Sequence, residues 1–375
     1  MMAKISRREF LKHSFWLAGG LMAMRYIKLP VFAQDGKPWK WSLEAMFYTP
    51  TARGIRCQLC PNECTIRPGE TGDCRNRVNY KGKLYTIAYG NPCAVHVDPI
   101  EKKPLYHYLP GTKSFSIATA GCNFACLNCQ NWEISQSSPK ETRNVELFPE
   151  QVVNQAIRNG CKTIAYTYSE PITFYEYMYD TAGIAHKRGI GNLLISNGYI
   201  NEEPLRTLAP KIDAANIDLK AFSNDIYMKL TAGTLEPILN TLQILRDMNV
   251  WVEITNLVIP TWTDDYVMIR KMCQWLVSNG FSEVPLHFSR FFPLYKLTQL
   301  PQTPTSTLVK AKEIAQSCGI KYVYIGNTAL PGSGNTICPS CGRVVVERKG
   351  MNVSSVNIKN GKCAWCGAPI AGKWG

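Results

Sequence analysis

Short apolar runs alternate with longer amphipathic segments through the middle of the chain. Seven runs have strand character, at residues 114–119, 163–167, 193–195, 215–217, 252–254, 286–288 and 322–325. Helical periodicity occupies much of the sequence between them, at residues 148–160, 172–188, 237–249, 265–280 and 306–318. Because strands joined through helices of this length pair in parallel, the pattern predicts an α/β fold whose sheet curves into a full barrel or a partial (βα)6 barrel.

Polar residues stand where these strands end, which is where barrel enzymes build their sites. They are Cys122 after the first strand, Glu170 after the second, Asn197 after the third, Asp218 and Lys220 after the fourth, residues 256–261 after the fifth and His287 on the sixth. Taken singly, Glu170 could begin a helix, Asp218 and Lys220 could be a surface pair, and His287 could be a core histidine. Because six such placements coincide, the sequence favours one shared site.

The loop after the first strand carries Cys122, Cys126 and Cys129 in the spacing Cys-x3-Cys-x2-Cys. Three thiolates can hold three irons of a 4Fe-4S cube and leave the fourth iron without a protein ligand. A zinc knuckle or a redox dithiol is the alternative, but zinc takes four nitrogen or sulfur ligands, and no histidine or fourth cysteine lies nearby in sequence. The spacing and its strand context therefore predict a cluster with an open iron.

This three-cysteine loop at the end of a first strand resembles the signature of the radical S-adenosylmethionine (radical SAM) enzymes. The resemblance implies that the open iron chelates the methionine moiety of S-adenosylmethionine. It also implies reductive cleavage to a 5'-deoxyadenosyl radical, which abstracts hydrogen from a substrate, and an electron donor of the flavodoxin or ferredoxin type. The protein's own task is then to bind, orient and exclude water, because the cofactor carries the chemistry.

The resemblance also implies roles for the residues at the strand ends. Glu170 holds the place of an acidic motif that contacts the methionine amino group, and Asn197 is expected to face the ribose or methionine region. Asp218, Lys220 and His287 look like their counterparts in pyruvate formate-lyase activating enzyme, where the lysine and histidine bind the methionine carboxylate. Such pairing is chemically sound, because cationic and imidazole donors bind carboxylates well.

One position departs from the superfamily pattern. An aromatic residue often precedes the third cysteine and supports adenine, but this chain has Asn128 there. We therefore expect adenine to contact another residue, with Tyr168 and Trp132 as the candidates.

A closer resemblance covers nearly the whole chain beyond its first residues, to the radical SAM member of the AmmeMemoRadiSam system. Four motifs carry it, at residues 57–64, 98–107, 129–136 and 287–291. The resemblance implies two companion proteins and a likeness to activators of glycyl radical enzymes, and it leaves the substrate open.

Four cysteines near the start, Cys57, Cys60, Cys64 and Cys74, form a second set, with turn-forming glycines between its third and fourth members. This spacing predicts a four-cysteine metal site. Zinc is the first choice and an accessory iron-sulfur cluster the second, since composition does not separate them. Disulfides stay possible outside the cytoplasm.

The third set consists of two Cys-x2-Cys pairs, Cys338 with Cys341 and Cys363 with Cys366. Paired knuckles of this kind predict a zinc ribbon with a structural or partner-docking role, joined through a Gly- and Pro-rich linker at residues 330–334. The remaining four cysteines are interpreted as buried small hydrophobes, namely Cys93, Cys161, Cys273 and Cys318.

The first residues resemble a bacterial export address. Residues 6–12 read SRREFLK, which matches the twin-arginine motif, and an apolar segment and small residues follow before Gln34. We therefore expect a periplasmic protein, although an uncleaved amphipathic helix on a cytoplasmic protein is the alternative. Export conflicts with the cofactors, because S-adenosylmethionine and low-potential reductants are cytoplasmic. The predicted regions are an export signal at 1–33, an N-terminal four-cysteine region at 34–110, a radical SAM core at 111–328 and a zinc ribbon at 329–375.

Composition narrows the partners. The chain has 375 residues, is 45% hydrophobic and contains no run of eighteen apolar residues, so a multi-spanning membrane protein is excluded. The net charge is +14, but the leader and the proposed metal-thiolate centres reduce the folded part to about +4. Charge alone therefore indicates no nucleic-acid partner. The alternative function is a non-catalytic iron-sulfur and zinc protein that binds nucleic acid or a partner protein, which would need basic and aromatic residues gathered on one surface.

Overall fold

The computed structural model describes residues 36–375. The chain divides into two units, residues 1–40 and 41–375, and the strands and α-helices described within residues 36–375 lie in the second. The expected export signal at residues 1–33 lies outside the described residues. Within them, no helix is both long enough and apolar enough to cross a membrane.

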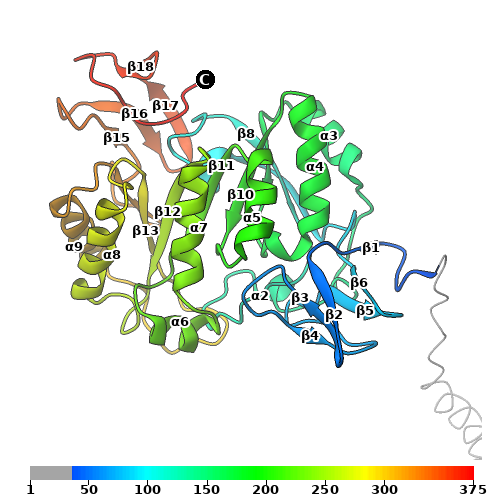
Figure 1. Cartoon of the computed structure of the whole chain (residues 1–375). Coiled ribbons are helices and arrows are strands. Elements are labelled where there is room, and N and C mark those ends of the chain that lie inside the picture. The colour runs from blue at the N-terminus through cyan, green and yellow to red at the C-terminus, as the bar shows by residue number, and fades with distance from the viewer. Residues whose placement is uncertain (1–35) are drawn as a thin grey trace, which may run out of the picture. The chain divides into compact units, whose positions relative to one another are not determined.

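An eight-stranded sheet forms the centre of the larger unit (Figure 1). Its strands are β7 (Ala94–Pro99), β8 (Lys113–Ala118), β9 (Thr163–Tyr166), β10 (Gly191–Ser196), β11 (Ala214–Asp218), β12 (Trp251–Val258), β13 (Leu286–Arg290) and β14 (Val323–Gly326). From β8 to β14 all neighbours are parallel and follow chain order. β7 and β14 are the two edges, so the curved sheet stays open and the predicted partial barrel of parallel strands is confirmed.

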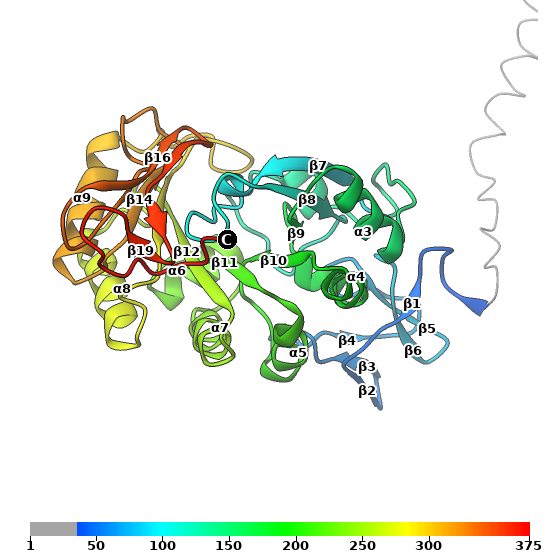
Figure 2. The same cartoon turned by 90° about the horizontal axis from the view of Figure 1, so that it is seen from above.

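Helices cover the outer face of this sheet (Figure 2). They are α3 (Pro149–Arg158), α4 (Tyr175–Lys187), α5 (Glu202–Leu208), α7 (Glu236–Asp247), α8 (Tyr266–Ser278) and α9 (Thr305–Ser317), while α2 (Trp132–Ser135) and α6 (Asn224–Thr231) lie in connections. Side-chain caps fix where some of them begin: Asp265 accepts from the Val267 N–H at 2.8 Å at the start of α8.

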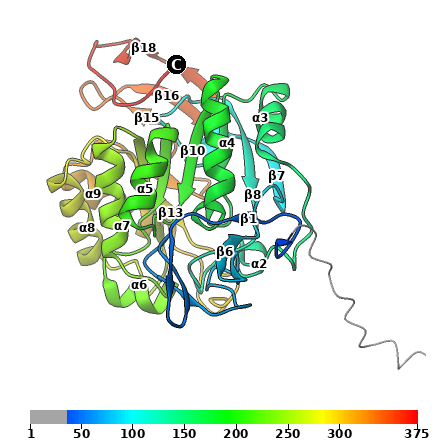
Figure 3. The same ribbon diagram turned by 45° about the vertical axis from the view of Figure 1, so that its right-hand side comes forward.

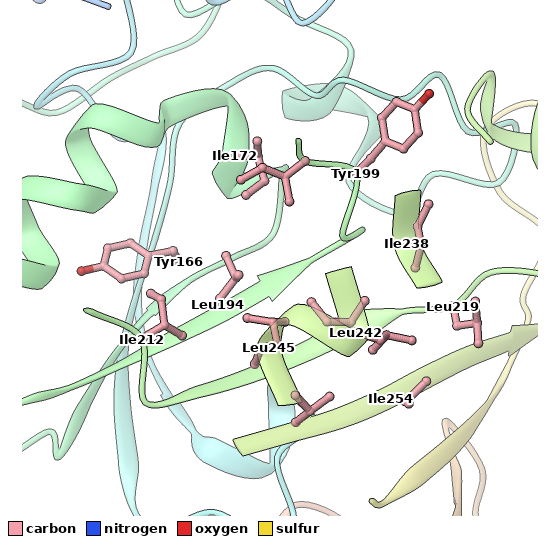
Figure 4. Packing of buried hydrophobic residues seen from close by; sticks show 14 of the residues in the cluster. Tyr166, Ile172, Leu194, Tyr199, Ile212, Leu219, Ile238, Leu242, Leu245 and Ile254 are labelled. Atoms are coloured by element: carbon pink, nitrogen blue, oxygen red, sulfur yellow. The ribbon is translucent and has the colours of Figure 1, made fainter. Parts of the chain in front are cut away.

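The contact between α7 and the strands shows how the core forms. Ile238, Leu242 and Leu245 recur on one face of α7 at helical spacing, and all three are fully buried. Figure 4 shows them facing strand residues such as Leu194 and Ile254. Burying each of these side chains contributes about 1.5–3 kcal/mol. The strands are apolar on both faces because a helix-covered parallel sheet is buried on both sides.

The segment before the barrel forms two small antiparallel sheets. One contains β1 (Leu43–Glu44), β6 (Lys83–Thr86) and β5 (Arg77–Tyr80), and the other β2 (Tyr48–Thr51), β3 (Gly54–Cys57) and β4 (Thr65–Ile66). We call residues 41–93 the N-terminal module. It packs at the carboxyl ends of the barrel strands: Asn76 donates to the Ala120 carbonyl after β8 at 2.8 Å, and Asn201 after β10 donates to the Gln58 carbonyl at 2.8 Å.

The segment after the barrel is also antiparallel. Its strands are β15 (Thr336–Ile337), β16 (Val344–Lys349), β17 (Asn352–Val356), β18 (Ile358–Lys359) and β19 (Lys362–Cys363). We call residues 336–375 the C-terminal module. It packs near the amino ends of the barrel strands, away from the N-terminal module, as Figures 1 and 3 both show. The Ala371 carbonyl and the Lys373 N–H there bind His107, at 2.6 and 2.7 Å.

The motif at residues 98–107 belongs partly to the central sheet. Its first part completes β7, and a 3-10 helix follows at Ile100–Lys102. Asp98 is buried and binds the ammonium groups of Lys102 and Lys103, at 2.9 and 2.6 Å. These ion pairs stabilise the buried Asp98 carboxylate near the end of β7.

Candidate functional site

The three-cysteine loop follows β8 and is held by backbone contacts. The Ala125 and Leu127 N–H groups donate to Thr231 and Leu230 carbonyls at the end of α6, both at 2.9 Å. At the start of the loop, Gly121 has φ +104°, and a Cβ there would lie 2.5 Å from the Cys74 carbonyl oxygen. Glycine is therefore required at this position, because the N-terminal module presses directly against the loop.

The thiols of Cys122, Cys126 and Cys129 converge on one cavity of about 1030 Å³. Burial raises the pKa of Cys126 to about 12, so without a metal this thiol stays protonated. The Phe124 N–H donates to the Cys122 sulfur at 3.4 Å. Three sulfur donors beside a roomy cavity fit a 4Fe-4S cube with one open iron, because three corners find ligands and the fourth faces space.

All five residues predicted to contact S-adenosylmethionine line this same cavity, namely Glu170, Asn197, Asp218, Lys220 and His287. Their placement follows from the parallel sheet, since the ends of β9, β10 and β11 meet at one edge. The structure therefore brings together what the sequence placed at separate strand ends. Their individual contacts with a cofactor stay predictions.

Glu170 is buried and both its oxygens are already engaged. One accepts from the Ser196 hydroxyl at 2.7 Å and from the Ile172 N–H at 3.1 Å, and the other accepts from the Asn197 N–H at 2.8 Å. Burial raises its pKa to about 7, although these donors oppose the rise. Glu170 thus fixes the end of β10 and the position of Asn197, and one lone-pair direction remains for a ligand.

Lys220 pairs with Asp218 at 2.8 Å, beside the cluster loop. Burial disfavours its charge, but Asp218 and the Cys126 sulfur outweigh burial and raise its pKa, so the ammonium stays charged. A fixed cation beside thiolates suits an anionic ligand group at this end of the cavity.

His287 lies deeper in the barrel and is tied to a residue that the sequence analysis missed. Its Nε2 lies 2.7 Å from an oxygen of Glu253, a fully buried carboxylate in the middle of β12. Glu253 also accepts from the Tyr106 and His107 N–H groups, at 2.9 and 2.7 Å. Burial would raise the pKa of Glu253, but His287 and these donors lower it. The sequence carried one sign of this residue, namely a single acidic position inside the apolar run 252–254.

A second missed group is the cluster around Asp98. Its carboxylate binds both lysines of the motif, the Ser116 hydroxyl at 3.0 Å and the Tyr168 hydroxyl. Burial lowers the pKa of Lys103 to about 8. Lys102 and Tyr168 line the large cavity.

Of the two candidates for adenine, Tyr168 lies on the cavity. Trp132 is 39% exposed and stacks on Tyr295, with ring centroids 5.3 Å apart. Trp132 is not among the residues that line the cavity.

Within each of the other two cysteine sets, the four thiols also lie close together in space. The thiols of Cys338, Cys341, Cys363 and Cys366 all lie within 4.8 Å of one another and could hold a metal ion. Those of Cys57, Cys60, Cys64 and Cys74 line a second, smaller cavity in the N-terminal module.

A partial parallel barrel whose first strand leads into three converging thiols, over a cavity lined from six strand ends, defines the class of radical SAM proteins. The model of the radical SAM superfamily matches residues 116–273. The chain belongs to the radical SAM superfamily.

Among its relatives, the uncharacterized protein MJ0808 of Methanocaldococcus jannaschii is 46% identical over 330 residues, which cover 87% of this chain and 98% of MJ0808. The pyruvate formate-lyase 1-activating enzyme of Escherichia coli strain K12 is 24% identical over 220 residues, which cover 54% of this chain and 89% of that enzyme. A solved structure of TYW1 with a lysine-pyruvate adduct bound aligns with a TM-score of 0.41 at 21% identity, over 56% of this chain and 76% of that one.

Proposed function

We propose that this protein is the radical SAM member of an AmmeMemoRadiSam system, an activating-enzyme-like oxidoreductase that cleaves S-adenosylmethionine reductively and abstracts hydrogen from a partner protein. The observation that carries the reaction type is one cavity of about 1030 Å³ that holds three converging thiols and five polar residues from the strand ends. The likeness to a pyruvate formate-lyase activating enzyme supports a protein substrate.

Each group of residues in the cavity would have its own role. Cys122, Cys126 and Cys129 would hold the 4Fe-4S cluster, which when bound supplies one electron to split S-adenosylmethionine into methionine and a 5'-deoxyadenosyl radical. Lys220 offers a fixed cation for the methionine carboxylate, and Glu170 offers an anionic oxygen for its amino group. The barrel walls exclude water from the reacting carbon.

The cavity has room beyond the cofactor for a substrate. Its far end is lined by the loop 327–335 and by Arg348, Lys349 and Met351 of the C-terminal module. Lys102 adds a cation to the wall between the two ends. The substrate is therefore proposed to meet the radical between the three-cysteine loop and the C-terminal module.

We also propose a flavodoxin- or ferredoxin-type electron donor and two companion proteins, which follow from the family resemblance. Residues 6–12 support twin-arginine export to the periplasm. Cell fractionation with N-terminal sequencing of the mature chain tests export, and an intact Met1 in the cytosol would refute it.

Anaerobic reconstitution tests the reaction. Protein loaded with iron and sulfide, reduced with dithionite and given S-adenosylmethionine is expected to yield 5'-deoxyadenosine, measured by mass spectrometry. Cys126→Ala should abolish the product, because the cluster loses one of three ligands. Cys318→Ala is the matched control, since Cys318 lies outside all three sets, and it should keep the activity. A fully loaded and reduced wild-type protein that forms no 5'-deoxyadenosine would contradict the proposal.

A further inference from the structure

The N-terminal module holds four thiols around one small cavity, apart from the large one. Cys57, Cys60, Cys64 and Cys74 line it together with Arg77. Each thiol interacts electrostatically with others of the set: Cys60 with the other three, and Cys74 with Cys57. Burial raises the pKa of Cys64 to about 12. The four are thus neighbours in space, around a position that no protein atom fills.

Their spacing differs from that of the C-terminal set. There, Cys338 and Cys366 sulfurs lie 3.7 Å apart, and Cys341 and Cys363 sulfurs 3.8 Å apart. A tetrahedron with zinc-sulfur bonds of about 2.3 Å has edges of about 3.8 Å, so that set has zinc dimensions.

Among residues 36–375, the C-terminal set is the one group of three or more possible ligands that lies within 4.8 Å of one another. The N-terminal four do not meet that limit. Neither do Cys122, Cys126 and Cys129, the signature set of an iron-sulfur superfamily. A cube binds each thiolate to a different iron and therefore spreads its sulfurs more widely than a single ion does. The N-terminal set thus follows the cluster pattern.

The walls of the small cavity suit an anionic centre. Arg77 is 1% exposed; one of its terminal nitrogens pairs with Glu176 at 2.6 Å and the other donates to the Met46 carbonyl at 2.7 Å. Its Nε is buried without a hydrogen-bond partner. The guanidinium interacts electrostatically with Cys57 and Cys74. A buried cation with an unused donor beside four thiols is explained by a metal-thiolate centre of net negative charge.

Backbone donors complete this environment. The backbone N–H groups of Asn76 and Arg77 favour the thiolate form of Cys74, and that of Asn62 favours the thiolate form of Cys60. Hydrogen bonds to ligating sulfurs of this kind tune iron-sulfur centres.

The three-cysteine loop reaches the small cavity as well. Asn123, between the first two cysteines of the three-cysteine loop, also lines the small cavity. The Asn62 amide donates to the Asn123 carbonyl at 3.0 Å, and the Asn197 amide donates to the Asn123 side-chain oxygen at 2.8 Å. Asn123 therefore connects the N-terminal thiols with the three-cysteine loop.

We propose that Cys57, Cys60, Cys64 and Cys74 hold a second 4Fe-4S cluster, beside the three-cysteine loop, while zinc occupies the C-terminal set alone. Four thiolates fill all four corners of such a cube, so this cluster has no open iron and does not bind S-adenosylmethionine. The assignment goes beyond the proposed reaction and does not depend on it.

Metal counting on protein purified without oxygen from iron-supplemented cells tests the assignment. Wild-type protein is expected to hold about eight irons and one zinc per chain. Cys60→Ala with Cys74→Ala should lower iron to about four and keep zinc. The matched pair, Cys338→Ala with Cys341→Ala, should lose zinc and keep all the iron.

A triple variant of Cys122, Cys126 and Cys129 to Ala leaves the N-terminal set intact and guards against misfolding of the double variant. It should keep about four irons and, after reduction, an electron paramagnetic resonance signal that S-adenosylmethionine does not change. A triple variant without iron would overturn the assignment, and so would wild-type protein with about four irons and two zincs. Because this readout needs no turnover, it separates failure here from failure of the proposed function.

Discussion

The two four-cysteine modules at the ends of the described chain begin with the same Cys-x2-Cys spacing yet differ in how they hold their thiols. The C-terminal sulfurs already lie at zinc distances, and Cys341 and Cys366 are exposed. The N-terminal sulfurs stand further apart around a cavity beside the three-cysteine loop. The difference shows that a shared Cys-x2-Cys pair does not fix how four sulfurs are spaced in the fold, and it is this spacing on which the two proposed metals rest.

Both modules also insert a buried arginine into the barrel unit, and these two residues do different things. Arg77 interacts with the N-terminal thiols and pairs with Glu176 on α4. Arg348 donates to the Tyr106 carbonyl at 2.6 Å, lies 3.8 Å from Glu101 and lines the large cavity. The first arginine lies at the proposed N-terminal metal site, and the second joins its module to the large cavity.

The largest effect is expected when the C-terminal module loses the zinc ion that we propose for it. Cys363→Ser removes a buried ligand, and structural zinc contributes about 10 kcal/mol or more to a small module. We expect residues 336–375 to lose their protection in hydrogen exchange while iron content is unchanged. Cys161→Ser, a buried cysteine outside the three sets, is the control. A module that stays protected without zinc would show that packing on the barrel suffices to fold it.

Replacing each buried arginine in turn tests whether the two residues have different roles. Arg77→Met and Arg348→Met should each lower the free energy of unfolding by about 3–5 kcal/mol, because each leaves a buried carboxylate without its cation. Only Arg77→Met should also reduce the iron content. Arg56→Met is the control, since Arg56 pairs with Glu63 at the surface and should cost about 1 kcal/mol or less. Denaturant unfolding and metal analysis measure both effects, and equal iron loss in the two buried variants would break the distinction.

The smallest of the three effects is expected in acid, which should weaken the contact between the C-terminal module and the barrel. Burial lowers the pKa of His107 to about 4. The positive charges of Arg348 and His287 also lower this pKa, whereas the negative charge of Glu253 raises it. The unfolded chain therefore binds more protons below about pH 6.5. The stability that His107 contributes is full above that pH and falls as the pH drops towards 4, by about 3 kcal/mol.

Hydrogen exchange at pH 7 and pH 5 measures this loss at residues 371–373 and β14. Residues 41–93 contain no histidine, so the N-terminal module is the internal control. His107→Gln should show less dependence on pH. Equal protection of the C-terminal contacts at both values would contradict the assignment.

Much of the barrel could be predicted because its periodicity is local. The parallel strands and α3, α4, α7, α8 and α9 appear close to their predicted ranges, since hydrophobic spacing reports which face is buried. The strand β7 is absent from the predicted runs because it carries a charged residue near its end, Asp98, whose burial depends on pairing with Lys102 and Lys103 beyond the strand. Glu253 was missed for the same reason: a single acid in an apolar run gives no sign of the histidine and backbone donors that surround it.

The sequence by itself determined the class of protein, because three cysteines on one loop after a strand need no distant partner to bind iron, and it determined which strand ends face the cavity. Only the tertiary structure decided that the N-terminal thiols lie beside that loop, and that the C-terminal module also lines the large cavity. Such contacts join residues far apart in the chain, and their free energy depends on distances and burial that no local pattern encodes.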